Sequence, residues 1–154
     1  LGDSIYNIFD SFDETPLAAA SLAQVHSAKL KNGNEVVIKV LRPNIEKSVK
    51  KNLRLLKAAA RIFSYIYKES YRLKPNEVIK DYEITIFKEL DLKLEASNTN
   101  LTRKNFLDSA ELYIPEVYWD LTTSNVMVLE KIDGIPCTDI DQIEKHGINK
   151  KELA

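Results

Sequence analysis

Val36-Val37-Ile38-Lys39-Val40-Leu41 is an apolar run, rich in β-branched residues, that holds a single lysine. Such a run is typical of a buried β-strand. Burying an ammonium group without a partner costs several kcal/mol, so Lys39 needs an anion or an open cleft beside it. A lysine that protects the edge of a sheet from aggregation is the alternative interpretation. The fold and the function both depend on what Lys39 faces.

The neighbouring residues predict a β-hairpin over 22–41. Its two arms flank Lys31-Asn32-Gly33, and Asn-Gly between β-prone runs is a strong hairpin signal. A two-residue loop places His26 opposite Lys39. A three-residue loop, with the glycine in the left-handed conformation, places Val25 there instead. A slip of one residue turns every side chain to the other face of the sheet, so the loop length decides which residues share the face of the lysine.

Helical periodicity dominates the middle of the chain. After Arg42-Pro43 a long helix is predicted from about Asn44, with an apolar stripe on one side and many lysines on the other. The stripe comprises Ile45, Val49, Leu53, Leu56, Ala60, Phe63 and Tyr67, and we expect core packing to bury it. Pro75 ends this pattern, and Asn76 is a good cap for a second helix that is predicted to run to about Phe106. The buried side of that second helix comprises Ile79, Tyr82, Ile86, Leu90 and Leu94.

The two ends of the chain add shorter elements. A short helix is predicted within residues 3–12, capped by Asp3 or Ser4. An extended segment is predicted over 114–120, a buried strand over 125–132, and short helical pieces over 139–154. Antiparallel strands interrupted by helices indicate an α+β fold with a sheet covered on one side.

Composition limits the functions open to the 154-residue chain. With 22 basic and 23 acidic residues the formal net charge is -1, which gives no support to nucleic-acid binding. The single cysteine, Cys137, cannot form an internal disulfide, and with two histidines it leaves no Cys/His zinc cluster. No uncharged apolar run reaches the ~18 residues of a membrane span. The N-terminus shows no signal-peptide pattern. Because the sequence lacks an initiator Met and ends abruptly at Glu152-Leu153-Ala154, we expect it to be part of a longer chain.

Three acidic residues on the second predicted helix are candidate partners of Lys39. Asp91 and Glu95 are four apart and share a face, whereas Glu89 and Glu95 are six apart and lie on different sides of one helix. Pairing of these acids with neighbouring lysines on a solvated face is the alternative. A strand lysine and a helix glutamate are the pair with which protein kinases position nucleotide phosphates. The sequence has no Gly-x-Gly-x-x-Gly or Walker loop, and Ala18-Ala19-Ala20-Ser21 stands at the corresponding place.

Four motifs together resemble the UbiB family of atypical protein-kinase-like proteins, called the ADCK group in animals. They follow one another in the family's order and cover roughly residues 12–136. The motifs are Pro16-Leu17-Ala18-Ala19-Ala20-Ser21-Leu22-Ala23-Gln24-Val25-His26, Val37-Ile38-Lys39-Val40-Leu41-Arg42-Pro43, Glu89-Leu90-Asp91 with Glu95-Ala96-Ser97-Asn98, and Ile114-Pro115-Glu116-Val117 with Leu129-Glu130-Lys131-Ile132-Asp133-Gly134. The resemblance implies a protein-kinase-like N-terminal lobe over 1–136, with an inserted long helix, and the start of the C-terminal lobe over 137–154.

The resemblance also implies a role for each matching residue. Lys39 would reach the α/β-phosphates of ATP, and Glu95 would be its partner, with Glu89 as the rival. Glu89 and Asp91 would otherwise form the family's acidic motif. The other nucleotide-binding residues would be Ala18, Ala19, Ala20 and Ser21 in the alanine-rich loop, Val25 and Val37 over the adenine, Leu129 as gatekeeper, and backbone groups of Glu130 and Ile132 at the adenine edge. The role of Val25 requires it to share the face of Lys39, which favours the three-residue hairpin loop.

Some parts of the family's pattern do not occur in this sequence. Nothing in residues 1–15 matches the Lys-x-Gly-Gln motif, and no Asp-Phe-Gly is present. In the family, the catalytic Asp and Asn and the metal-binding Asp lie in the C-terminal lobe. We therefore expect no metal site here, with the ligands of Mg²⁺ in that other lobe, and we expect the chain alone to be inactive and to bind nucleotide weakly.

For the longer protein the resemblance implies an ATP-dependent phosphotransferase or ATPase that supports ubiquinone biosynthesis. Its partners would be ATP and proteins or lipid intermediates of that pathway, and it would be cytoplasmic and associated with the inner membrane. A pseudokinase-like scaffold that uses nucleotide only as a conformational switch is the alternative, and a generic α+β binding domain is a third. The lysine-rich first long helix is a weaker candidate for contact with anionic lipid, because we expect packing to account for its stripe. His26 is expected to be a structural strand residue and Cys137 an inert thiol.

Overall fold

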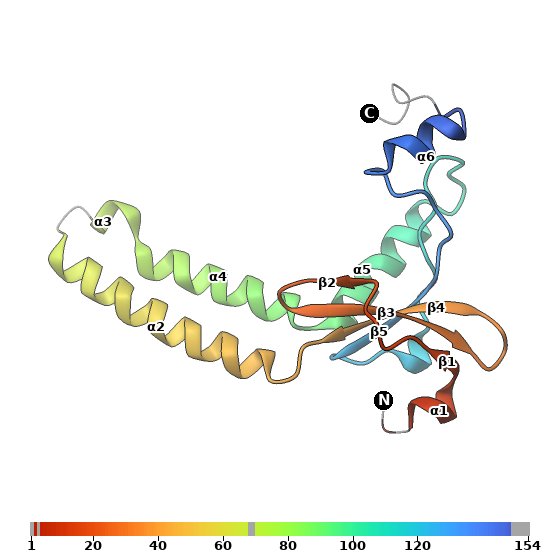
Figure 1. The fold of residues 1–154 in the computed structure, drawn as a ribbon. Helices are drawn as coiled ribbons and strands as arrows, with labels where there is room; N and C mark the ends of the chain where they lie inside the picture. Colours follow the sequence, from red (N-terminus) through yellow and green to blue (C-terminus); the bar gives the residue numbers. More distant parts are fainter. Residues whose placement is uncertain (1, 3, 68–69, 149–154) are drawn as a thin grey trace.

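The structure, a computed structural model, describes residues 2, 4–67 and 70–148. A five-stranded sheet has the strand order β1-β3-β4-β5, with β2 paired to β3, and its strand pairs are antiparallel. Helices lie beside the sheet and extend away from it (Figure 1), which confirms the predicted α+β class. The elements are α1 (Ile5–Ile8), β1 (Phe9–Phe12), β2 (Ala18–Ala19), β3 (Ala23–Leu30), β4 (Glu35–Leu41), α2 (Ile45–Ile66), α3 (Ser70–Leu73), α4 (Pro75–Glu89), α5 (Leu92–Asn105), the 3-10 helix η1 (Trp119–Leu121), β5 (Val126–Glu130) and α6 (Ile140–Lys145).

The β3–β4 hairpin has the three-residue loop. The Leu30 N–H donates to the Asn34 carbonyl at 2.9 Å, and the Gly33 N–H donates to the Leu30 carbonyl at 2.9 Å. Gly33 has a φ of 92°, a conformation that glycine adopts without the penalty paid by other residues. The resulting register places Val25 opposite Lys39, as predicted.

The face of the sheet that carries Lys39 packs against α5. Met127 of β5 lies opposite Lys39 in the register, and opposite residues of an antiparallel pair share a face. Met127 is buried together with Leu92 and Ala96 from α5. The complete buried cluster on this face is Ala23, Leu41, Leu90, Leu92, Ala96, Val117 and Met127. This cluster holds the helix against the strand that bears the lysine.

The other face of the sheet is also packed, so the prediction of a sheet covered on one side is wrong. The short helix expected within residues 3–12 ends at Ile8, and Phe9–Phe12 joins the sheet as β1. Phe9 is buried there, with Tyr118 and Leu121 packed against the same cluster. The buried members are Phe9, Ala28, Leu30, Val36, Ile38 and Val128. Ser4 occupies the N-cap position of α1, and Asp3, the other expected cap, lies outside the described residues.

The second predicted helix is two helices, so the prediction of one continuous helix to about Phe106 is wrong. Helix α4 ends at Glu89 and α5 begins at Leu92. Leu90 and Leu92 are both buried in one cluster, and residues two apart cannot face the same side of a continuous helix. The break resolves this conflict, and Asp91 caps α5 by accepting a hydrogen bond from the Lys93 N–H at 3.0 Å.

Three further boundaries differ from the predictions. Helix α4 begins at Pro75, after Lys74 in a left-handed conformation with φ 44°, and not after a cap at Asn76. The segment predicted as extended over 114–120 makes an isolated bridge from Val117 to Leu129 and then turns into η1. Of the helical pieces predicted over 139–154, α6 is present, and residues 149–154 lie outside the described residues.

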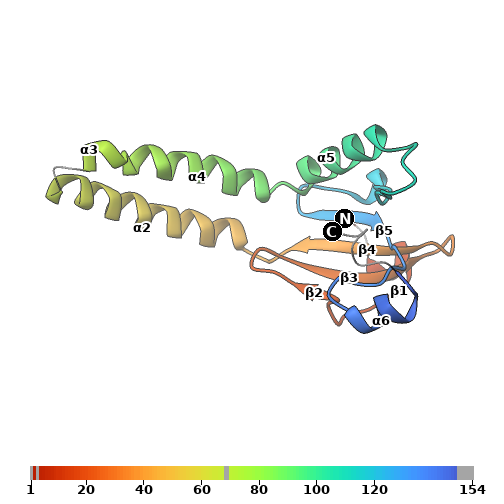
Figure 2. The same cartoon turned by 90° about the horizontal axis from the view of Figure 1, so that it is seen from above.

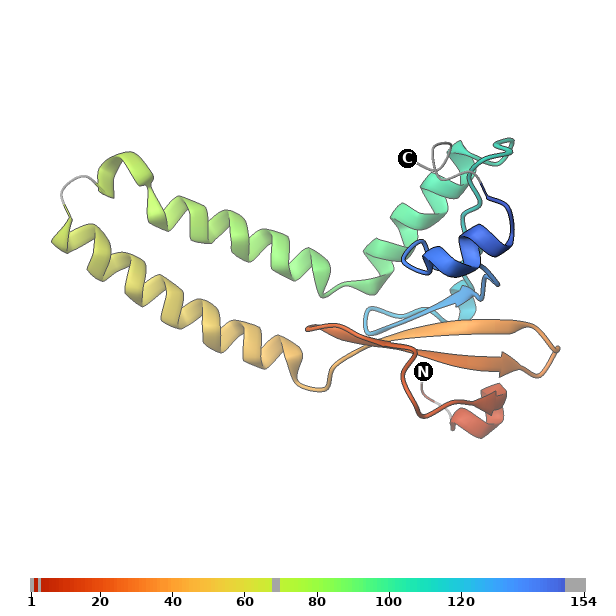
Figure 3. The ribbon, with the colours of Figure 1, turned by 45° about the horizontal axis from the view of Figure 1, so that its top comes forward.

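Helices α2 and α4 form a long antiparallel hairpin that projects away from the sheet (Figures 1 and 3). Its helices are joined by the Lys57–Glu83 ion pair at 2.7 Å. Of the predicted apolar stripe on α2, Leu53 and Ala60 are buried, whereas Leu56 and Phe63 are exposed. The expectation that core packing buries the whole stripe is therefore wrong, because the projecting hairpin has a single partner helix instead of a core. None of the helices in the described ranges is long and apolar enough to cross a bilayer.

Candidate functional site

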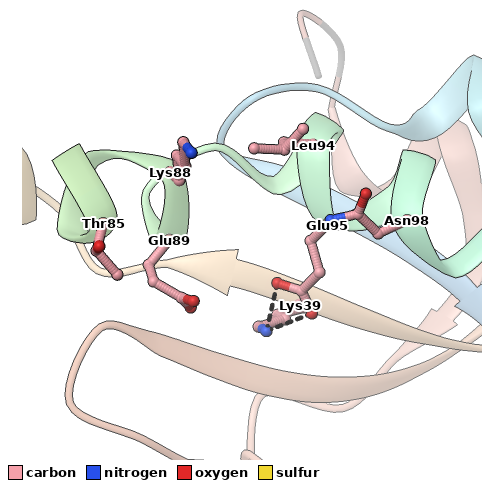
Figure 4. A pocket seen from close by; sticks show the side chains of 7 residues that line it. All are labelled: Lys39, Thr85, Lys88, Glu89, Leu94, Glu95 and Asn98. Atoms are coloured by element: carbon pink, nitrogen blue, oxygen red, sulfur yellow. Dashed lines mark hydrogen bonds and ion pairs between the residues drawn. The ribbon is translucent and has the colours of Figure 1, made fainter.

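Lys39 and Glu95 form an ion pair between the sheet and α5. The Lys39 Nζ lies 2.6 Å and 2.7 Å from the two carboxylate oxygens of Glu95 (Figure 4). The side chains keep 32% and 40% of their surface exposed, so neither charge is fully removed from water. The ammonium thus has both an anionic partner and an open side, and either one meets the need of a lysine in an apolar strand.

The packing of α5 explains why Glu95 is the partner. Ala96, the next residue, is fully buried against the sheet, and Leu92 lies one turn earlier on the buried side. A small alanine side chain at the contact lets the helix approach the sheet closely. Glu95, which borders this buried side in the first turn of α5, therefore projects over β4 toward Lys39.

A cleft of about 380 Å³ opens beside this pair, at the break between α4 and α5. It is lined by Lys39, Thr85, Lys88, Glu89, Leu94, Glu95 and Asn98 (Figure 4). Glu89 therefore shares the cleft with Lys39, but the ion pair is made by Glu95. Asp91, the third acid, serves as the cap of α5.

Sequence reasoning missed four of the residues that line the cleft. They are Thr85, Lys88, Leu94 and Asn98. Asn98 follows Glu95 by three residues and shares its side of α5, which is a usable signal. Thr85 and Lys88 reach the cleft because α4 stops at Glu89, and a continuous helix gives no reason to expect them there.

The alanine-rich segment forms a tight turn next to the lysine strand. Ala18 and Ala19 pair with Val25 and Gln24 of β3. The Ala20 N–H donates to the Ala23 carbonyl at 2.9 Å, and the Ala20 carbonyl accepts from Arg42 Nε at 3.0 Å. The predicted loop residues Ala18, Ala19, Ala20 and Ser21 are all exposed. The turn therefore presents small side chains to solvent, at the end of β3 that pairs with the lysine strand just beyond Lys39.

The predicted apolar residues share the face of Lys39. Val25 lies opposite Lys39, and Leu129 lies opposite Val37, two residues along the lysine strand. Successive residues of a strand alternate between faces, so Val37 and Lys39 point to the same side. All three apolar side chains are partly buried. This face combines an apolar surface with one cation. The apolar surface suits the flat ring face of a nucleotide base, and the cation suits its anionic phosphates.

Glu130 is the last residue of β5, and Ile132 lies two residues beyond it. The Glu130 N–H donates to the Glu116 carbonyl at 2.9 Å, so backbone contact of Glu130 with a ligand is limited to its carbonyl oxygen. Its carboxylate accepts a hydrogen bond from the Tyr113 hydroxyl at 2.7 Å, and this bond raises the pKa of Tyr113 above 10.0. Ile132 is exposed beyond the end of β5.

The site offers no built metal centre in the part of the chain that the structure describes. No group of three or more His, Cys, Asp or Glu side chains gathers there in an arrangement that holds a metal ion. The carboxylate of Glu95 is already paired with Lys39. Lys39 itself is a cation, which suits phosphate oxygens and not a metal ion.

Comparison with known proteins gives a consistent result. The model of the ABC1 atypical kinase-like domain matches residues 1–154. Proteins named "Probable protein kinase UbiB" are similar along nearly the whole chain: 52% identical over 97% of it in Shewanella sp. (strain ANA-3), 50% over 100% in Aeromonas hydrophila, and 49% over 100% in Cellvibrio japonicus. The chain spans 28% of the length of each of these relatives.

A solved structure shares the fold. It is the complex of Rv3197 with erythromycin from Mycobacterium tuberculosis, which superposes with a TM-score of 0.64 at 25% identity. The match covers 94% of this chain and 34% of that one. The predicted resemblance to UbiB proteins and the kinase-like fold are thereby confirmed. The chain belongs to the family of ABC1 atypical kinase-like domains.

Proposed function

We propose that this chain is the ATP-binding lobe of a UbiB-type atypical kinase or ATPase that supports ubiquinone biosynthesis. The observation that carries the proposal is the bidentate Lys39–Glu95 pair, because it holds a partly exposed lysine at the wall of a cleft. A lysine fixed in this way can contact phosphate oxygens without a further loss of side-chain conformational entropy. The family relationship supports the same reading.

In this proposal each part of the face has one task. Lys39 binds the α/β-phosphates and Glu95 holds it in place. Val25, Val37 and Leu129 offer the apolar surface for the adenine, while the alanine-rich turn lies over the phosphates. Mg²⁺ bound with the nucleotide neutralises charge on the phosphates, and its ligands come from the C-terminal lobe.

The proposal extends to the setting of the intact protein. Its partners are ATP and the proteins or lipid intermediates of ubiquinone biosynthesis, and it acts on the cytoplasmic side of the inner membrane. The resemblance of the motifs to the UbiB family supports this setting. The 154-residue chain by itself is expected to bind nucleotide weakly and to hydrolyse none.

The test is ATP hydrolysis by the intact protein with Mg²⁺, comparing wild type with Lys39→Ala. We expect hydrolysis to fall by about a hundredfold or more, because the phosphate-binding cation is lost. Lys31→Ala, in the exposed hairpin loop, is the matched control and should hydrolyse ATP at the wild-type rate. Equal rates for Lys39→Ala and wild type would refute the role of Lys39. Binding of Mg-ATP by wild type without any hydrolysis would favour the pseudokinase-like scaffold.

A further inference from the structure

Arg42 holds the alanine-rich turn at two of its carbonyl groups. The backbone N–H of Arg42 donates to the Leu22 carbonyl at 2.9 Å, and the Nε of its side chain donates to the Ala20 carbonyl at 3.0 Å. These two carbonyls stand on either side of Ser21, so a single residue is bonded to both sides of the turn. Figures 1 and 2 show this turn, which joins β2 to β3, next to the chain that leads from β4 into α2.

The side-chain bond adds a link that strand pairing does not provide. In the described sheet β2 pairs with β3 and not with the lysine strand β4. The bond from Arg42 Nε to Ala20 therefore ties the β2 side of the turn to the end of the strand that carries Lys39, three residues after the lysine. The alanines of the turn are exposed, and their methyl groups bury too little surface to hold it. The position of the turn thus depends on its hydrogen bonds.

The backbone of Arg42 is itself well fixed. Pro43 follows it, and a proline restricts the residue before it to extended backbone conformations. The Arg42 carbonyl accepts a hydrogen bond from the Ile45 N–H at 3.2 Å, where α2 begins. Within the ranges that the structure describes, no acidic side chain forms an ion pair with the guanidinium of Arg42 and draws it away from the turn. Only the Arg42 side chain has to be ordered for the bond to Ala20.

We propose that Arg42 is a positioning residue of the nucleotide site, which fixes the alanine-rich turn over the phosphates of ATP through its bond to the Ala20 carbonyl. This inference rests on the proposed ATP-binding function. A turn that is already fixed loses less conformational freedom when the nucleotide binds, so the bond lowers the KM for ATP. Because Lys39 and Arg42 stand on one short stretch of chain, the turn and the phosphate-binding ammonium keep the same relative position.

The test replaces Arg42 in the intact protein by side chains that keep or lack a donor at the place of Nε. Counted along the side chain, Arg42→Gln has an amide N–H donor at that place and Arg42→Met has a methyl group. We expect Arg42→Met to raise the KM for ATP by about five- to tenfold with little change in kcat, because the nucleotide must then order the turn. Arg42→Gln should recover most of this loss. Arg54→Met, at an exposed arginine of α2, is the matched control and should keep the wild-type KM.

The Gln variant separates the hydrogen bond from the charge. If Arg42→Gln is as impaired as Arg42→Met, the bond to Ala20 is not the cause and the proposal is overturned. Recovery by Arg42→Lys in that case would assign the effect to a direct contact between the charge and the phosphates. A wild-type KM in Arg42→Met would also overturn the proposal. The bond is exposed, so we expect the melting temperatures of these variants to stay close to that of the wild type.

Hydrogen exchange without nucleotide measures the restraint itself. Peptides that cover residues 17–23 should exchange faster in Arg42→Met than in the wild type or Arg54→Met, and Arg42→Gln should restore their protection. Equal exchange in Arg42→Met and the wild type would overturn the proposal, because the turn would then be held without Arg42. This measurement does not depend on ATP, whereas failure of the nucleotide site itself would appear as unchanged hydrolysis in Lys39→Ala. The two failures can therefore be told apart.

Discussion

Lys39 has two glutamates in its cleft, Glu89 and Glu95, and the structure pairs it with one of them. We predict that Glu95→Gln lowers kcat/KM for ATP in the intact protein by about ten- to a hundredfold, because the ammonium loses the carboxylate that holds it. Glu89→Gln should have the smaller effect, since it leaves the ion pair intact. Steady-state hydrolysis of both variants makes the comparison.

The loss in Glu95→Gln should not come from unfolding. Exposed ion pairs contribute about 1 kcal/mol or less to stability, so its melting temperature should stay close to that of the wild type. A larger loss of activity in Glu89→Gln than in Glu95→Gln would mean that Lys39 changes partner in the working enzyme.

Tyr113 gives a prediction that depends on pH. Its hydrogen bond to the Glu130 carboxylate raises its pKa above 10.0, because ionising the phenol loses the bond and places two negative charges together. Below pH 10.0 the bond therefore contributes fully to stability, and the contribution is lost as the pH rises through the raised pKa. Ultraviolet titration of wild type against Tyr113→Phe should show one late-ionising tyrosine, and Glu130→Gln should return it toward 10.0. Ionisation of Tyr113 at 10.0 in the wild type would contradict this.

At the same scale, the sequence predicts Lys39 better than its partner. The ammonium inside an apolar strand follows from local chemistry. The Asn-Gly turn left two loop lengths open, and only the role implied by the family resemblance favoured the loop that places Val25 opposite Lys39. The sequence could not decide between Glu89 and Glu95, because the directions of their side chains were compared on one continuous predicted helix. They stand on two helices.

The break between α4 and α5 is the decisive feature at the scale of elements. Asp91 caps α5, and the Leu92 N–H donates to the Ser124 carbonyl at 3.0 Å, which ties the start of the helix to the turn before β5. We predict that Asp91→Ala lowers the free energy of unfolding by about 1 kcal/mol, because the cap is lost. Asp91→Asn keeps a capping oxygen and should cost only a few tenths. Urea denaturation measures both.

The Asn variant separates the cap from the charge. If Asp91→Asn is as destabilised as Asp91→Ala, the carboxylate acts through its charge and the cap is not the cause. The break itself is hard to predict, since the apolar spacing continues across it. The sequence holds one indication of the break: Leu90 and Leu92 are both apolar and both buried in one cluster, and residues two apart cannot face the same side of a helix.

The whole molecule combines a well-packed sheet with a thinly packed hairpin. The sheet has a buried cluster on each face, and Phe9, predicted as part of a helix, joins one of them from strand β1. Helix α2 buries only Leu53 and Ala60 in its 22 residues, and α4 buries no residue fully. A continuous apolar stripe in the sequence does not reveal whether a core or one helix lies beside it, so this difference was not predictable from periodicity.

This contrast predicts uneven local stability. Amides in the second half of α2, over residues 58–66, should exchange with deuterium well before those of β3 and β4, because local opening there exposes little apolar surface. Hydrogen exchange read out by mass spectrometry, on the intact protein, measures this. Protection of residues 58–66 equal to that of the strands would mean that another surface covers the hairpin in solution.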